Sequence, residues 1–171
     1  MPDLIIRIKK KTDGAAALSC TRADGSVTWQ RQEGQLGKFF PLHDLTHYAV
    51  ECVLDLPRAF YGLLAEGWDL TDFGKTGTKG SLPEDALLAE LIVGFFDLER
   101  ATGTLSNAEE FNEKVRSWYA DHNRVPTSFR MSDAQLTRIR QVRADAFASW
   151  RALPPGDTME IPFERGAQSV A

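Results

Sequence analysis

Short apolar runs separated by polar residues near the start of the chain predict β-structure. The run from Leu4 to Ile8 is rich in isoleucine, which favours a strand. Two further runs, Ala15–Arg22 and Val27–Arg31, flank a short polar segment that contains Asp24-Gly25, a pair typical of tight hairpins. We therefore expect the first 32 residues to form a small antiparallel sheet.

From residue 42 onward the apolar positions recur at helical spacing. A helix over 42–56 is expected to stop before Pro57. A second helix over 58–66 is expected to end at Gly67. The segment before the first helix, "EGQLGKFFP", is interpreted as a connector.

Three later helices are predicted by the same local signal. In each, a serine is followed three residues later by Glu or Gln, the spacing of a capping box. The pairs are Ser81 with Glu84, Ser106 with Glu109, and Ser132 with Gln135. They predict helices over about 81–102, 106–123 and 132–152.

The alternating segment 157–163, "DTMEIPF", predicts a last strand that returns to the N-terminal sheet. The expected class is α+β, with a small antiparallel sheet packed on a body of about five helices. A chain of 171 residues fits one domain, with a β region over 1–32, a helical region over 42–152 and the returning strand.

The charge and composition of the chain exclude some classes of binding partner. A net charge of −4 argues against a nucleic-acid surface, which needs a basic stripe. The two cysteines, Cys20 and Cys52, lack the spacing of a metal-binding pair and are expected to be reduced thiols. No stretch approaches the roughly 20 apolar residues of a membrane span, and the apolar run at the N-terminus is too short for a signal peptide. We therefore expect no nucleic-acid or membrane partner and a cytoplasmic location.

The glycine-rich segment 74–80, "GKTGTKG", departs from the phosphate-binding motif GxxxxGK[ST] in spacing and order. A mobile basic loop is the preferred interpretation, because glycine adds to the entropic cost of ordering the chain. Such a loop could cover a site near the first helix.

Two of the three histidines, His43 and His47, lie four residues apart in the segment "PLHDLTHYAVE". On a helical wheel they share a stripe of roughly 120° with Asp44, Glu51 and Asp55, and most other positions of this helix are apolar. The i, i+4 spacing places the two imidazoles on one face, about 6 Å apart along the axis. That arrangement suits two ligands of one metal ion.

A third ligand has to come from elsewhere. Glu51 lies about 12 Å along the axis from His43, too far for one tetrahedral ion, and is a better partner for His47. The candidates are His122, Glu90 and Asp97. Glu90 interrupts an apolar run, where a carboxylate is costly unless it is paired or bound to a metal. Its helix face could line a cavity, form a thin solvent strip or contact another helix.

The pentapeptide "HDLTH" resembles the first half of the zinc motif HDxxHx11E of the ubiquinone-biosynthesis family. His43, Asp44 and His47 match, and Ala59 stands where the family has its distal glutamate. The longer segment 41–69 resembles small bacterial proteins of unknown function. The first resemblance implies zinc binding, and the second implies no established activity.

Two classes of function follow. In the first, His43 and His47 bind zinc or another divalent transition metal, Asp44 or Glu51 positions water, and the protein hydrolyses a small molecule. Metal binding would then weaken below about pH 6.5, where histidine is protonated. In the second, a non-catalytic structural or interaction protein exposes the polar stripe to solvent. The sequence indicates neither a substrate nor an oligomeric state.

Overall fold

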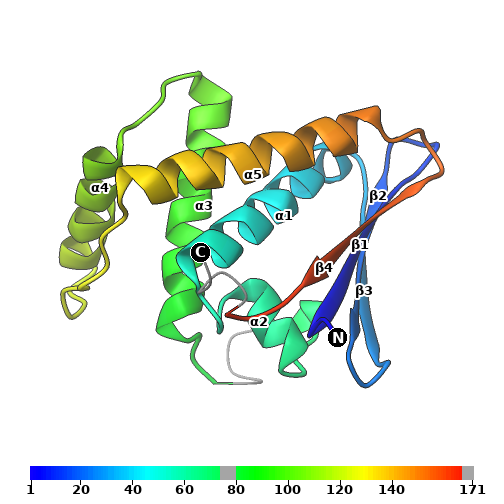
Figure 1. The fold of residues 1–171 in the computed structure, drawn as a ribbon, viewed down its shortest axis with the longest axis horizontal. Helices are drawn as coiled ribbons and strands as arrows, with labels where there is room; N and C mark the ends of the chain where they lie inside the picture. The colour runs from blue at the N-terminus through cyan, green and yellow to red at the C-terminus, as the bar shows by residue number, and fades with distance from the viewer. Residues whose placement is uncertain (74–79, 167–171) are drawn as a thin grey trace.

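The computed structural model describes residues 1–73 and 80–166, and its fold is α+β as predicted (Figure 1). Its four strands are β1 (Leu4–Lys10), β2 (Ala16–Arg22), β3 (Val27–Gln32) and β4 (Thr158–Phe163). They form one antiparallel sheet in the order β3-β2-β1-β4. The C-terminal strand therefore returns to the N-terminal hairpins, where Ile161 pairs with Ile6. Most of the segment expected to be a mobile loop, 74–79, lies outside the described residues.

The helical part comprises α1 (Gln35–Leu54), α2 (Phe60–Ala65), the short 3-10 helix η1 (Leu70–Asp72), α3 (Glu84–Thr102), α4 (Ala108–Asp121) and α5 (Asp133–Ala152). Figure 1 shows α1, α2 and α5 on one side of the sheet, with α3 and α4 further from it. Over the described part of the chain, no helix is long and apolar enough to cross a membrane.

Helix α1 lies at the centre of the molecule and belongs to two hydrophobic clusters. Leu45 packs with the inward-facing side chains of the sheet, among them Ile6 and Leu18. Ala49 and Val50 pack with residues of α3, α4 and α5. Both sides of α1 are therefore covered, and His43, Asp44 and His47 lie between them and line a cavity. The fold thereby directs the histidine-bearing face toward enclosed space.

The beginning of α1 differs from the prediction. The helix begins at Gln35, so the segment interpreted as a connector is largely helical. Pro41 removes one helical hydrogen bond, but backbone bonds from Leu36 and Gly37 to the Glu33 carbonyl anchor the first turn. Gly37 also lies close to the sheet: a Cβ atom there would be 2.8 Å from the backbone oxygen of Gln32. Tertiary packing thus overrides the local proline signal.

The three expected helix caps have different outcomes. Ser132 and Gln135 form the capping box that was predicted for α5. The box of α4 is displaced by one residue and consists of Asn107 and Glu110, because an asparagine oxygen caps as well as a serine oxygen. The Ser81 cap was wrong: α3 begins at Glu84 after Pro83, with no side-chain cap.

Candidate metal centre

His43 and His47 lie one turn apart on α1, and their ring centroids are 4.9 Å apart. Both rings therefore point to one side of the helix, as the spacing predicts. Their burial differs, because the side chain of His43 is 18% exposed and that of His47 only 2%. The pair is thus well shielded from bulk water.

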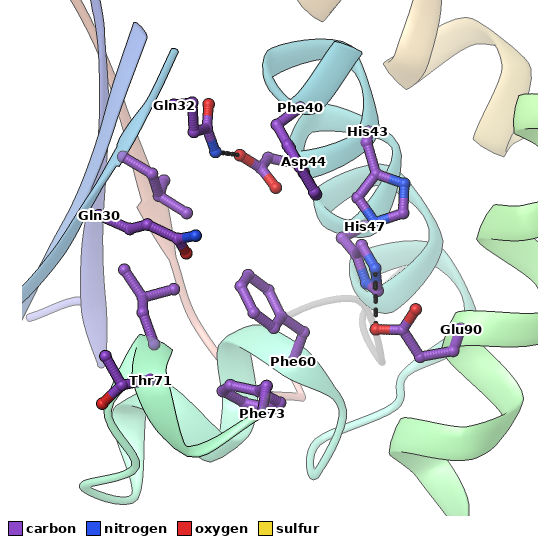
Figure 2. A pocket seen from close by; sticks show the side chains of 12 residues that line it. Gln30, Gln32, Phe40, His43, Asp44, His47, Phe60, Thr71, Phe73 and Glu90 are labelled. Carbon is purple, nitrogen blue, oxygen red and sulfur yellow. Dashed lines mark hydrogen bonds and ion pairs between the residues drawn. The ribbon is translucent and has the colours of Figure 1, made fainter. Parts of the chain in front are cut away.

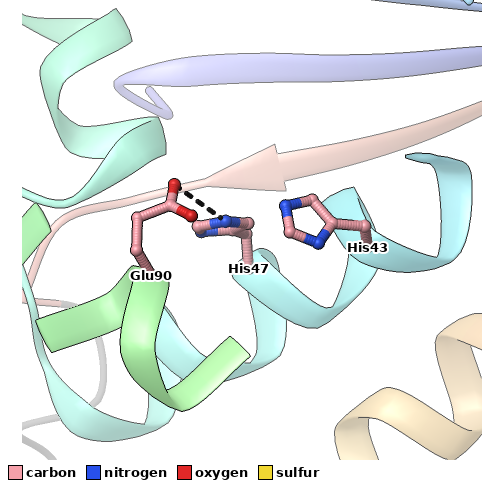
Figure 3. Close-up of side chains that lie close together, drawn as sticks. All are labelled: His43, His47 and Glu90. Atoms are coloured by element: carbon pink, nitrogen blue, oxygen red, sulfur yellow. Dashed lines mark ion pairs between the residues drawn. The ribbon is translucent and has the colours of Figure 1, made fainter. Parts of the chain in front are cut away.

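Glu90 of α3 reaches the same place from the opposite side (Figure 3). Its Oε1 atom lies 3.3 Å from Nε2 of His47. One ligand atom from each of His43, His47 and Glu90 falls within 4.8 Å of the other two. Donors held about 2 Å from a tetrahedral ion are roughly 3.3 Å apart. His47 and Glu90 already have that separation, and the ligand atom of His43 lies within 4.8 Å of both.

Each imidazole also has a carboxylate beside its Nδ1 atom. Nδ1 of His43 lies 2.6 Å from Oδ2 of Asp97, and Nδ1 of His47 lies 3.1 Å from Oε1 of Glu51. A neutral ring in this setting donates its Nδ1 proton to the acid, which leaves Nε2 free of a proton. Histidines that bind metals are typically oriented in this way.

Glu51 has a second task that the sequence did not indicate. Its Oε2 atom accepts a hydrogen bond of 2.9 Å from the backbone N–H of Tyr61, in the first turn of α2. The carboxylate therefore caps a helix that has no side-chain cap of its own. Burial raises the pKa of Glu51, while its bonds to His47 and Tyr61 oppose that rise. Since both oxygens face protein donors, Glu51 is directed away from the cavity.

The charges around His47 favour its protonated form when no metal is bound. Burial alone would lower the pKa of this imidazole, but its bonds to Glu51 and Glu90 outweigh burial and raise the pKa to about 10. For Glu90, burial acts to raise the pKa, and the neighbouring His47 more than offsets it and lowers the value. The pKa of Asp97 is lowered in the same manner by His43 and Arg100, against the effect of burial. The charges of His47 and Glu90 therefore stabilise each other.

The site opens into a cavity of about 550 Å³ between α1, β3, α2 and α3 (Figure 2). Asp44, next to His43 in sequence, lines this cavity and is 3% exposed. Its Oδ2 atom accepts a hydrogen bond of 2.9 Å from Nε2 of Gln32 on β3. Burial raises the pKa of Asp44 to about 6, against the lowering effects of Gln32 and His43. Aromatic side chains form much of the remaining wall: Phe40, Phe60 and Phe73.

The structure separates the residues that the sequence nominated. His43, His47 and Glu90 come together, and Asp97 stands behind His43. His122 is exposed at the end of α4, stacked on Trp118 with centroids 3.9 Å apart, and is not part of the group. Sequence reasoning missed the cavity residue Gln32. Its only signal was a polar residue at an inward position of a strand.

No known protein family, no curated protein and no solved structure matches this chain. The geometry of the site is therefore the basis for any functional conclusion.

Proposed function

We propose that the protein binds one divalent transition-metal ion through His43, His47 and Glu90. The carrying observation is that three ligand atoms from two helices fall within 4.8 Å of one another. Two imidazoles and one carboxylate form a ligand set that suits zinc and its neighbours better than magnesium or calcium. Asp97 and Glu51, on the far sides of the rings, support the assignment because they orient both imidazoles.

We propose further that the centre hydrolyses a small molecule. Three protein ligands would leave a coordination position open, as in catalytic zinc sites, and His43, His47 and Glu90 all line the cavity. A divalent ion there would lower the pKa of a bound water and polarise the bond that is cleaved. Asp44 keeps its carboxyl group in the cavity, so we assign it contact with the water or the substrate. Glu51 is assigned the orientation of His47.

One observation favours the non-catalytic alternative. Both nitrogens of His47 already have a carboxylate partner, so a protonated ring is satisfied without a metal. In that case the network only joins α1, α2 and α3. The two proposals differ in one measurable property, which is the affinity for a divalent ion.

Zinc titration of the metal-free protein tests the proposal. We expect one ion per chain for the natural sequence and loss of binding when His43 and His47 are both replaced by alanine. The substitution His122→Ala is the matched control, because it removes an exposed histidine outside the group. Equal, weak heats of zinc binding from the natural protein and the double variant would contradict metal binding and support the non-catalytic alternative. Circular dichroism establishes that each variant is folded.

A further inference from the structure

The inner face of β3 is unusual for a strand that packs toward the interior. Its inward positions are Thr28, Gln30 and Gln32, all polar, whereas those of β1 are apolar. Thr28 accepts a hydrogen bond from the backbone of Leu70. The two glutamines line the cavity and face α1 across it (Figure 2). Thr28 thus holds η1 against the sheet, whereas the two glutamines give the cavity a polar wall.

Asp44 lies opposite this wall and, among the described residues, forms no direct ion pair. Among the described residues no lysine or arginine forms an ion pair with it, and Gln32 supplies its one side-chain hydrogen bond. Charged side chains buried to this degree are normally paired, because desolvating a lone charge is costly. Figure 2 shows the second carboxylate oxygen of Asp44 directed toward the open space.

Gln32 also has a polar atom without a hydrogen-bond partner among the described residues. Its Nε2 atom donates to Asp44, but its Oε1 atom is buried and has no hydrogen-bond partner among the described residues. A buried acceptor left without a donor is unfavourable. Its burial also shields this oxygen from the cavity, so of the two side chains it is Asp44 that presents an acceptor to the open space.

The other walls define the shape of a complementary molecule. Phe60 and Phe73 lie side by side with ring centroids 4.8 Å apart, and Phe40 projects from α1. Aromatic faces favour flat groups and attract cations. A cavity of about 550 Å³ has the size of a small-molecule site.

We infer that Asp44, held in place by Gln32, binds a planar, cationic nitrogen group, of the amidinium or guanidinium type, on the molecule that enters this cavity. Such a group offers parallel N–H donors, which form strong paired hydrogen bonds with a carboxylate. Its positive charge would form a direct ion pair with Asp44, and its flat shape suits a cavity walled by the phenylalanines. This inference deepens the proposed function by naming the substrate class of the same cavity, yet it does not depend on a bound metal.

The test uses benzamidine, which joins a flat apolar ring to an amidinium. Its binding is followed by calorimetry or NMR near neutral pH with a chelator present, so that no metal contributes. We expect benzamidine to bind at least about tenfold more tightly than neutral benzamide, and benzoate to bind not at all. Equal affinities for benzamidine and benzamide, or no benzamidine binding at roughly millimolar concentration, would overturn the inference.

A matched pair of variants locates the interaction. Asp44→Asn should weaken benzamidine binding at least about tenfold, while Asp55→Asn, an equal charge change at the exposed end of the same helix, should leave it unchanged. If Glu90→Gln abolishes binding and Asp44→Asn does not, the amidinium pairs with Glu90 and the assignment is wrong. Zinc affinity is measured separately, so failure of the metal proposal and failure of this one give different results.

Discussion

Nδ1 of His43 lies 2.6 Å from Oδ2 of Asp97, which is 54 residues further along the chain. This contact ties α1 to α3 at the level where Glu90 approaches His47 one helical turn away. It also decides which nitrogen of His43 is available, because the ring atom held by Asp97 cannot bind a metal. The relationship makes Asp97 a positioning residue rather than a ligand.

Replacing Asp97 with asparagine should therefore weaken zinc binding without abolishing it. The amide keeps the shape of the side chain but lacks the charge that holds the His43 ring in its orientation. Loss of such a partner typically lowers metal affinity by about 10- to 100-fold. Competition with a chromophoric chelator measures the change, and Asp121→Asn, at the exposed end of α4, is the control of equal charge. Equal affinities for Asp97→Asn and the control would remove Asp97 from the site.

Zinc binding should release about one proton per ion at neutral pH. In the metal-free protein the pKa of His47 is raised to about 10, so this ring is protonated at pH 7 and must lose its proton to bind. Affinity should therefore rise about tenfold per pH unit from near pH 7 toward 10. An unpaired histidine would instead show a threshold near 6.5. Calorimetry in buffers of different ionisation enthalpy counts the protons, and a count of zero at pH 7 would contradict the protonated network.

The sheet was predictable from sequence because its local signals agree with its tertiary role. The isoleucine-rich run from Leu4 to Ile8 forms a strand with a buried face, and Asp24-Gly25 lies in the turn of a hairpin. The first two turns of α1 were not predictable in the same way. Pro41 is a local signal against a helix, and only the close approach of Gly37 to the backbone of β3 and of the segment before β2 explains why the helix begins earlier.

For the candidate site, the sequence predicts which residues share a face of one helix, but it does not predict which residues of different elements come together. His43 and His47 share a face whatever the fold, so the pair could be proposed from sequence. Glu90 and Asp97 could only be nominated, because their positions depend on how α3 packs against α1. Gln32 joins the site through the register of an edge strand, which no local pattern reveals.

Asp44→Asn should stabilise the metal-free protein at neutral pH. Burial raises the folded-state pKa of Asp44 from 3.8 to about 6, so folding favours its protonated form. This contribution to stability is complete below about pH 3.8 and is lost as the pH rises through 6. Above that range the buried charge is unfavourable, by up to about 3 kcal/mol for a shift of this size, and asparagine avoids it while still accepting a bond from Gln32.

Urea unfolding near pH 4 and near pH 7.5 provides the measurement, and the gain of Asp44→Asn should appear only at the higher pH. Asp55→Asn, at the exposed end of α1, should show no such difference between the two conditions. A variant that is less stable than the natural protein at pH 7.5 would mean that the carboxylate supports the fold. A more stable variant indicates that the charge is present for binding or chemistry.

A pair of glycine substitutions tests whether α2 supports the metal centre. A Cβ atom at Gly62 would lie 1.9 Å from the carbonyl oxygen of Pro57, so alanine there must displace α2. A Cβ atom at Gly94, an exposed position of α3, would enter open space with no neighbouring atom within 4 Å. We expect Gly62→Ala to cost roughly 3 kcal/mol or more of unfolding free energy. Gly94→Ala should instead add about 0.5–1 kcal/mol, because alanine favours a helix.

The two glycine variants should also differ in their affinity for zinc. Displacing α2 breaks the bond between the Tyr61 N–H and Glu51, and Glu51 is the group that holds Nδ1 of His47. Gly62→Ala should therefore bind zinc more weakly by about tenfold or more even at a temperature where it is fully folded. Gly94→Ala should retain the natural affinity. If Gly62→Ala is destabilised but binds zinc normally, then His47 is oriented without help from α2, and the Glu51 cap serves the fold alone.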